Sequence, residues 1–305
     1  MANPSSYHAN GKLLLAGEYF VLYGANALAL PLKVGQQLIV QDGFPSATIS
    51  WQAFYEEKVW FSCELNPQNF SVISTNYPEK AATLSKIFKT IRTLNPAFHP
   101  KVGTRLETSL DANPEWGFGS SSTLISLLSQ WAEVNPFILN EQVFKGSGFD
   151  IACATANGPI FYIKSEPARP VTLDYPFAEQ LFLVYSGKKK KTITEVDAFL
   201  KGKKVSAHLI DEISALSEEF ADCRIQKEFN FLIRQHEQLV GKLIGQVTVK
   251  EHFFSDFDGE IKTLGAWGGD FYLVSTAQPF SSVKKYFDNM GLTTIFRWKD
   301  LILKR

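Results

Sequence analysis

A glycine-rich segment at residues 113–122 places the strongest constraint on this 305-residue chain. It reads NPEWGFGSSS and stands directly before TLISLLSQWAEV, whose apolar residues recur at helical spacing. Glycine costs backbone entropy and adds no side chain to the packing, so a helix that begins in this way needs a reason. One reason is an anion, because the first turn of a helix presents backbone N–H groups and the positive end of its dipole. The simpler alternative is a flexible turn with a serine at the helix start, and the segment alone leaves both open.

This segment matches neither of the common nucleotide-binding loops. No Gly-Lys-Ser/Thr follows it, so it is not a Walker A loop. It resembles a dinucleotide fingerprint only loosely, because Ser122 stands where the third glycine would be.

Composition and charge exclude several classes of protein. Apolar residues make up 45% of the chain and charged residues 20%, as in an ordinary globular protein. The 31 Lys and Arg residues balance the 31 Asp and Glu residues, which argues against a nucleic-acid-binding protein. The apolar runs LLLA and LFLVY are too short to span a bilayer. We therefore expect a protein without nucleic-acid or membrane partners.

The N-terminus and the cysteines indicate a cytoplasmic protein. The start, MANPSSYHANGK, lacks the apolar segment of a signal peptide. Cys63, Cys153 and Cys223 are far apart and show neither zinc-ligand spacing nor a disulfide framework. This cysteine usage fits a reducing compartment.

Alternating and helical apolar patterns predict a chain of mixed α and β structure. In the first half we expect strands in residues 12–32, QQLIVQD, ATISWQAF, KVWFSCEL and GTRLETSLD, and helices over about 79–94 and 120–134. In the second half we expect strands in LFLVYSG, FYLVST and TTIFRW, and helices over about 206–221, 226–247 and 280–290. The prolines of SEPARPVTLDYP indicate a domain boundary near residues 165–180.

Three further segments carry chemistry-bearing residues. GKLLLAGEYFVLYG holds Lys12 and Glu18, which are either an ion pair between strands or a lysine aimed at a phosphate. GSGFDIACA holds Asp150, which either caps a helix or orients and deprotonates an attacking hydroxyl. LGAWGGD, expected between a helix and a strand, is either a tight connection or a second wall around phosphates.

Taken together and in this order, these segments resemble the GHMP kinase superfamily, over a stretch from about Lys12 to Val274. GKLLLAGEYFVLYG, GSGFDIA and Asp270 are most similar to phosphomevalonate kinases. Mevalonate kinases resemble the first two segments, but usually differ beside Asp150 and usually lack an acid at the position of Asp270.

The resemblance implies an α+β fold of two domains. Residues 1–170 would form an ATP-binding domain with a mixed sheet, helices and a left-handed βαβ crossover, which runs against the usual rule. Residues 171–305 would form a ferredoxin-like domain. ATP and the acceptor would share the cleft between the two domains.

The resemblance also implies site residues. The catalytic pair would be Lys12 and Asp150, and magnesium would be held by Ser121, with Glu141 as a weaker second candidate. ATP would be bound by Gly117, Phe118, Gly119, Ser120, Ser121 and Ser122. The acceptor and the cleft would involve Glu18, Tyr19, Ser147, Gly148, Lys188, Gly265, Ala266, Gly268, Gly269 and Asp270. Two bulky residues, Trp116 and Trp267, depart from the family's usual small residues.

The activity that the resemblance implies is transfer of a phosphoryl group from ATP, with Mg²⁺, to phosphomevalonate in the mevalonate pathway of isoprenoid precursor synthesis. The alternatives are mevalonate or another alcohol as the acceptor and, in a different class, a non-catalytic relative that binds a nucleotide or metabolite. The presence of both Lys12 and Asp150 favours an enzyme. Its partner would be a small-molecule substrate, and the chain would be a monomer or a homodimer.

A run of four lysines, Lys188 to Lys191, follows the expected strand LFLVYSG. Such a run is ordinarily a solvated loop. In a chain of zero net charge it is also a local positive field, suited to a substrate that already carries a phosphate. The sequence thus predicts that one or more of these lysines, with Thr192 or Thr194, contacts that phosphate.

Overall fold

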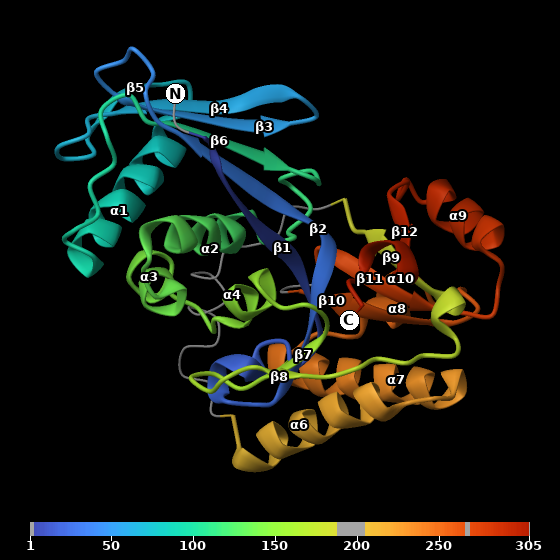
Figure 1. Ribbon diagram of the computed structural model, residues 1–305. Coiled ribbons are helices and arrows are strands. Elements are labelled where there is room, and N and C mark those ends of the chain that lie inside the picture. Colours follow the sequence, from blue (N-terminus) through green and yellow to red (C-terminus); the bar gives the residue numbers. More distant parts are fainter. Residues whose placement is uncertain (1–2, 188–204, 266–268, 305) are drawn as a thin grey trace. The chain divides into compact units, whose positions relative to one another are not determined.

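A computed structural model describes residues 3–187, 205–265 and 269–304 (Figure 1). The chain divides into two compact units that are discontinuous in sequence. Unit 1 consists of Met1–Gly11, Val34–Pro114 and Phe118–Thr155, and unit 2 consists of Lys12–Lys33, Glu115–Gly117 and Ala156–Arg305. A single boundary at residue 170 would instead give two continuous domains, so that division stays a prediction.

The described residues of unit 1 form a mixed sheet and four helices. The sheet runs in the order β5-β4-β3-β6-β2, and β1 pairs with β2. β3 and β6 are parallel, whereas β2–β6, β3–β4 and β4–β5 are antiparallel. The strands are β1 (Ser5–Ala16), β2 (Ala27–Gln41), β3 (Ile49–Tyr55), β4 (Lys58–Leu65), β5 (Val72–Thr75) and β6 (Arg105–Leu110). The helices are α1 (Pro78–Leu94), α2 (Ser120–Ala132), α3 (Pro136–Val143) and α4 (Phe149–Ala154).

One hydrophobic core joins this sheet to its helices. Buried strand residues such as Trp51 and Phe61 contact the same cluster as Phe88 of α1 and Leu128 of α2. The predicted apolar face of α1 is confirmed, since its buried residues recur at three- and four-residue spacing. Pro78 begins this helix at a position where its missing N–H has no partner to lose.

Unit 2 has a second, antiparallel sheet of order β10-β11-β9-β12. Its strands are β9 (Leu181–Tyr185), β10 (Glu260–Leu264), β11 (Phe271–Ser275) and β12 (Ile295–Arg297). Its helices are α6 (Ala207–Asp222), α7 (Gln226–Ile244), α8 (Val249–Phe253), α9 (Phe280–Asn289) and α10 (Trp298–Leu301). The order β-α-β-β-α-β and the strand sequence match the expected ferredoxin-like arrangement.

Both faces of this sheet are buried. Phe182 and Val184 of β9 belong to a core that α8 and α9 complete with Phe254 and Phe287, where Phe254 directly follows α8. α7 packs against β10. Unit 2 also holds β7 (Ile160–Tyr162) and β8 (Arg169–Pro170), which extend the first sheet beyond β2, and the short 3-10 helices η1 (Phe20–Tyr23) and η2 (Ala178–Gln180).

The structure corrects three expectations about local elements. Phe20–Tyr23 is the 3-10 helix η1 and not a strand. The expected helix 226–247 is shorter, because α7 ends at Ile244 before Gly245, whose φ of 71° is left-handed. The segment LGAWGGD connects two strands, β10 and β11, instead of a helix and a strand.

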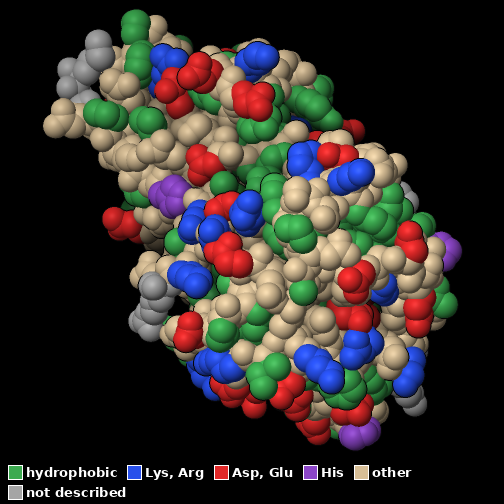
Figure 2. All heavy atoms as spheres, turned by 90° about the vertical axis from the view of Figure 1, so that its right-hand side faces the viewer, with side chains coloured by type: hydrophobic (Ala, Val, Ile, Leu, Met, Phe, Trp, Pro, Cys, Tyr) green, Lys and Arg blue, Asp and Glu red, His purple; other side chains and the backbone are tan. Residues whose placement is uncertain are grey.

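Two findings bear on partners. Among the described residues, no helix is long and apolar enough to cross a membrane. Figure 2 shows Lys and Arg side chains interspersed with Asp and Glu side chains on the face that it displays, consistent with the balanced charge of the chain.

Candidate active site

The glycine-rich segment leads into the N-terminus of α2, as its pattern predicts. Gly119 precedes the helix with a φ of 90°, a left-handed conformation that side chains disfavour. The Ser122 hydroxyl is buried and donates to the Gly119 carbonyl at 2.8 Å, so it stabilises the turn. Ser121, by contrast, is exposed in the first turn. Within the described part of the chain, no side chain caps the start of α2, so its first N–H groups lack a side-chain acceptor there.

Asp150 lies in the first turn of α4. The residue before this helix is Gly148, with a φ of 90°, so Asp150 is not the cap that the simpler interpretation assigned to it. Its Oδ1 accepts a hydrogen bond from the Ile151 N–H at 3.0 Å. Asp150 and Ser147 are both half-buried. Asp150 belongs to unit 1 and Lys12 to unit 2, so their proposed pairing stays a prediction.

Within unit 2 the structure brings three of the sequence segments together. The Lys12 ammonium donates to the Gly117 carbonyl at 2.9 Å, which joins β1 to the glycine-rich segment. The Asp270 side chain lies against the Cα of Gly117, where an added Cβ would stand only 2.2 Å from Oδ2. The same carboxylate lies near Gly265. Lys12, Gly117 and Asp270, which are more than 100 positions apart in the sequence, therefore lie close together.

Trp116 anchors this neighbourhood. Its ring lies 5.2 Å from Phe296 and 6.3 Å from Tyr185, measured between centroids. The Tyr185 hydroxyl also donates to the Glu115 carbonyl at 3.2 Å. The bulky residue that departs from the family pattern thus packs against the strands β12 and β9, and holds the loop in place.

The remaining predicted site residues fall into two groups. Lys188, Ala266, Trp267 and Gly268, with Lys189 to Lys191, Thr192 and Thr194, lie outside the described residues. Gly269 is described and has a φ of 74°. Glu141 lies on the exposed side of α3, and the described residues contain no group of three or more carboxylate, histidine or cysteine ligands that could hold a metal.

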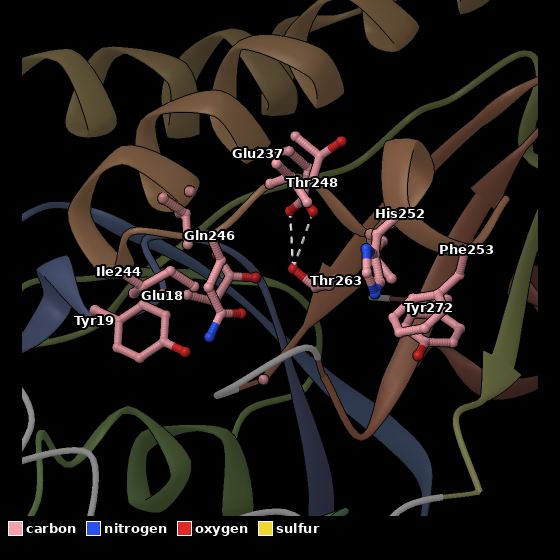
Figure 3. Close-up of a pocket in the computed structure, with 15 residues that line it drawn as sticks. Glu18, Tyr19, Glu237, Ile244, Gln246, Thr248, His252, Phe253, Thr263 and Tyr272 are labelled. Carbon is pink, nitrogen blue, oxygen red and sulfur yellow. Dashed lines mark hydrogen bonds between the residues drawn. The ribbon is translucent and has the colours of Figure 1, made fainter. Parts of the chain in front are cut away.

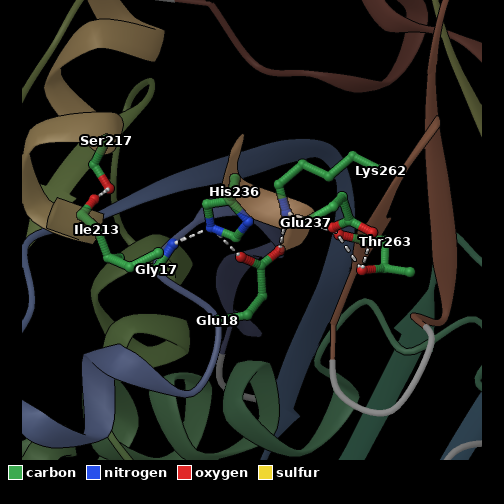
Figure 4. Close-up of polar contacts among 8 residues, drawn as sticks. All are labelled: Gly17, Glu18, Ile213, Ser217, His236, Glu237, Lys262 and Thr263. Carbon is green, nitrogen blue, oxygen red and sulfur yellow. Dashed lines mark hydrogen bonds and ion pairs between the residues drawn. The ribbon is translucent and has the colours of Figure 1, made fainter. Parts of the chain in front are cut away.

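Glu18 belongs to a buried network of ionisable residues in unit 2 (Figure 4). Its Oε1 accepts from the Lys262 ammonium at 2.6 Å, and its Oε2 lies 3.0 Å from His236 Nε2. Lys262 also lies 3.7 Å from the Glu237 carboxylate, which accepts from the Thr263 hydroxyl. Lys262 and His236 are fully buried. The chain holds these charges away from water, so their pairing controls their protonation.

Burial and pairing set the pKa values in opposite directions. Burial by itself would raise the pKa of Glu18, but the positive charge of Lys262 and the contact with His236 outweigh it and hold that pKa below its ordinary value. Burial raises the pKa of Glu237 to about 7, because Lys262 already pairs with Glu18. Burial and the charge of Lys262 lower the pKa of His236, so its imidazole is neutral and accepts the Gly17 N–H at 3.1 Å.

The sequence resemblance placed Glu18 at the acceptor or the cleft, and nothing in the sequence revealed its three partners, His236, Glu237 and Lys262. The first two lie inside the amphipathic α7, where the pattern shows only a helix face that turns inward. Lys262 stands two residues before LGAWGGD, and the surrounding residues EIKTL carry no pattern that marks a lysine as buried.

Tyr19 follows Glu18 with a φ of 64°, in the left-handed region that a bulky residue rarely adopts. Its side chain is almost fully buried and lines the same cavity as Glu18 and Glu237 (Figure 3). Backbone strain of this kind clusters at functional sites.

We expect Glu18→Gln and Glu237→Gln to have opposite effects on stability at about pH 8. The first leaves Lys262 buried beside a neutral amide, which lowers the free energy of unfolding by about 3–5 kcal/mol. The second removes a carboxylate whose charged form is disfavoured in the folded state. It is expected to raise the free energy of unfolding by about 1–3 kcal/mol.

The pH dependence follows from the raised pKa of Glu237. Between its ordinary value of 4.5 and about 7, the folded chain keeps a proton that the unfolded chain has lost. Stability contributed by this group therefore falls as the pH rises through that window, and Glu237→Gln abolishes this part of the slope. Urea unfolding from pH 5 to 8 measures both effects, and equal destabilisation by the two substitutions at pH 8 would contradict the assignment.

The contact between Gly117 and Asp270 predicts a coupled pair. Gly117→Ala introduces a Cβ that meets the Asp270 carboxylate at 2.2 Å, and its φ of 70° adds strain, so the variant should be clearly destabilised. In an Asp270→Ala background the nearest clashing atoms are gone, and the same substitution should be about 1 kcal/mol milder. A double-mutant cycle on thermal unfolding measures this coupling, and strict additivity would show that the two segments are not in contact.

Comparison with known proteins supports the fold. No protein-family model and no curated protein sequence matches this chain. Solved structures do match over nearly its whole length. A mevalonate kinase from Methanococcus jannaschii has a TM-score of 0.72 at 17% identity, and covers 100% of this chain and 99% of its own.

Two further structures extend the comparison. A phosphomevalonate kinase from Streptococcus pneumoniae has a TM-score of 0.66 at 16% identity, covering 97% of this chain and 100% of its own. A Lactococcus lactis galactokinase has a TM-score of 0.64 at 9% identity, covering 99% of this chain and 94% of its own. The resemblance seen in the sequence is thus confirmed for the architecture, and the chain has the two-domain α+β fold of the GHMP kinases.

Proposed function

We propose that this chain is an ATP-dependent kinase that transfers the γ-phosphoryl group to a small acceptor. Phosphomevalonate is the first candidate, and mevalonate or another alcohol is the alternative. The observation that carries the proposal is the meeting of Lys12, Gly117 and Asp270, because it brings together the segments that carry the resemblance. One similar structure is a phosphomevalonate kinase in complex with phosphomevalonate and AMPPNP. The reaction would belong to isoprenoid precursor synthesis in the cytoplasm.

The phosphates of ATP would bind at the start of α2. There the backbone is left-handed at Gly117 and Gly119, and among the described residues no side chain caps the first helical turn. A helix N-terminus with this backbone favours negative charge and admits close approach of phosphate oxygens. Phe118 is buried, and its part in binding ATP stays a prediction.

Magnesium fits the residues present. Ser121 offers an exposed hydroxyl oxygen in the first turn of α2, and Mg²⁺ is ordinarily held by one or two protein oxygens together with phosphates and water. A complete protein cage is therefore not required. When bound, the ion would neutralise charge on the phosphates.

Lys12 and Asp150 would carry the transfer itself. Phosphoryl transfer depends on positioning and charge stabilisation more than on covalent chemistry. The Lys12 ammonium would lie at the acceptor oxygen or at the transferring phosphoryl group. Asp150 would orient the acceptor. With phosphomevalonate, which is already ionised, its role is mainly electrostatic. With mevalonate it would act as a base, contributing roughly 10²–10⁴-fold.

A coupled ADP-release assay tests the activity. The intact chain with ATP and Mg²⁺ should release ADP fastest with phosphomevalonate, compared with mevalonate, homoserine and galactose. A higher rate with mevalonate would favour the alternative acceptor. Nucleotide binding without turnover on any of the four would favour a non-catalytic relative.

The same assay on Asp150→Asn separates its two possible roles. The variant should lose most activity with mevalonate, and a smaller part with phosphomevalonate. Full activity on every acceptor would remove Asp150 from the mechanism.

Ser121→Ala and Ser122→Ala form a matched pair for the ATP loop. Ser121→Ala should weaken Mg²⁺-dependent nucleotide binding while leaving the unfolding temperature unchanged, because the hydroxyl is exposed. Ser122→Ala should lower the unfolding temperature, because it loses the hydrogen bond to Gly119. Gly119→Val is a poor probe, since a β-branched residue at a φ of 90° is strained whether or not ATP binds there.

Titration calorimetry with ATP, together with thermal unfolding, measures both variants. If Ser121→Ala binds Mg-ATP as tightly as the unaltered chain, Ser121 does not hold the ion.

A further inference from the structure

Unit 2 contains a cavity of about 420 Å³ that the proposed phosphoryl transfer does not explain. Its walls come from α7, the turn after it, α8, β10, β11 and the residues that follow β1 (Figure 3). Its size lies within the range of sites that bind small molecules. All its lining residues belong to unit 2.

The deepest part of the cavity is acidic. Glu18 and Glu237 line it with exposed fractions of only 4% and 6%. Among the described residues, Lys262 is the lysine that pairs with both, at 2.6 Å from Glu18 and 3.7 Å from Glu237. One lysine therefore serves two carboxylates, and Glu237 has the weaker share. Glu237 also accepts hydrogen bonds from Thr263, whose hydroxyl lies within reach of both carboxylate oxygens and whose backbone contributes a further bond.

The mouth of the cavity is apolar and aromatic. Val247 is 65% exposed and Phe253 is 47% exposed, and both line it. Ile244 and Tyr272 continue the apolar surface inward. In Figure 3, Tyr19 lies on one side of the Glu237–Thr263 pair and Tyr272 on the other. A ligand that fits this cavity has an apolar body and a polar end directed at Glu237.

We propose that this cavity binds a small organic cation, an ammonium group on an apolar body, with the ammonium donating to Glu237. Lys262 pairs more closely with Glu18 than with Glu237. The bound ammonium would therefore supply the positive charge that Glu237 lacks. Aromatic rings at the wall add attraction to a cation. An anionic end, such as a phosphate or carboxylate, would meet Glu237 and be repelled.

A metal ion does not fit the same position. Lys262 already stands between the two carboxylates, and the described residues include no cluster of three or more metal ligands. The cavity includes Glu18, Tyr19 and Gly265, which the resemblance assigned to the acceptor. The inference rests on the chemistry of the cavity itself, and stands whether or not the chain transfers phosphate.

Protonation of Glu237 couples binding to pH. Burial raises its pKa to about 7, and a bound ammonium would favour the charged form and lower that pKa again. Below about pH 7, binding must therefore release a proton from Glu237, and affinity should rise as the pH rises through this range. The other ionisable groups that face or line the cavity are Lys262, Glu18, His236, His252, Tyr19 and Tyr272. A protonated His252 would repel a cation as well, so the contribution of Glu237 has to be isolated by substitution.

The test uses three probes of similar shape on the intact chain: 2-phenylethylammonium, 2-phenylethanol and 3-phenylpropanoate. In titration calorimetry at pH 8 the ammonium should bind at least about tenfold more tightly than the alcohol, and the carboxylate should bind least. At pH 6 the ammonium should bind more weakly, and its enthalpy should change with the ionisation enthalpy of the buffer, which reports proton release.

Glu237→Gln should weaken binding of the ammonium by about tenfold or more and remove the proton release. Glu228→Gln is the matched control, because it makes the same change on an exposed residue of the same helix. It should leave the affinity for the ammonium and the proton release unchanged. If Glu237→Gln fails to fold, proton release by the unaltered chain still decides. The proposal is overturned by tighter binding of the carboxylate, by full affinity in folded Glu237→Gln, by binding without proton release at pH 6, or by no binding of the ammonium at millimolar concentrations.

Discussion

The buried ion pair between Glu18 and Lys262 is the interaction on which the rest of unit 2 depends. It joins the residues that follow β1 to β10, across 244 positions of sequence, at 2.6 Å and almost without contact with water. Because a buried charge without its partner is strongly unfavourable, this pair fixes the end of β1 relative to β10. His236 supports the same corner by accepting the Gly17 N–H. Lys12 lies on the same strand, β1, and its ammonium donates to the Gly117 carbonyl.

A second constraint comes from positions where the backbone requires glycine. At Gly117 a Cβ would overlap the Asp270 carboxylate, so the close approach of two loops explains one glycine of the segment. Gly119 and Gly148 have left-handed backbones before α2 and α4, which explains two more. These glycines are therefore required by the fold, and any role with phosphate is additional.

Charge makes one environment in each unit suited to a different kind of ligand. The N-terminus of α2 favours an anion, and the acidic end of the unit 2 cavity favours a cation. In the proposed reaction the phosphates of ATP take the first environment, and a phosphorylated acceptor does not suit the second. The lysine run 188–191, the positive segment that the sequence offered for such an acceptor, lies outside the described residues. Kinases of mevalonate, phosphomevalonate and galactose share this fold with the chain at 9–17% identity. Turnover assays, and not the fold, therefore distinguish between these acceptors.

The sequence by itself determined the elements with strong periodicity and the segments with unusual glycine content. α1 and α2 begin within one residue of the expected positions, because helical spacing and flanking residues are local signals. It did not determine η1, since FVLY has the apolar character of a strand and only the contacts of Gly17 and Phe20 make it a tight turn. Nor did it find His236, Glu237 and Lys262. Their importance comes from lying beside Glu18, and that proximity exists only once α7 and β10 pack together, because ion pairs between distant residues leave no periodic trace in a sequence.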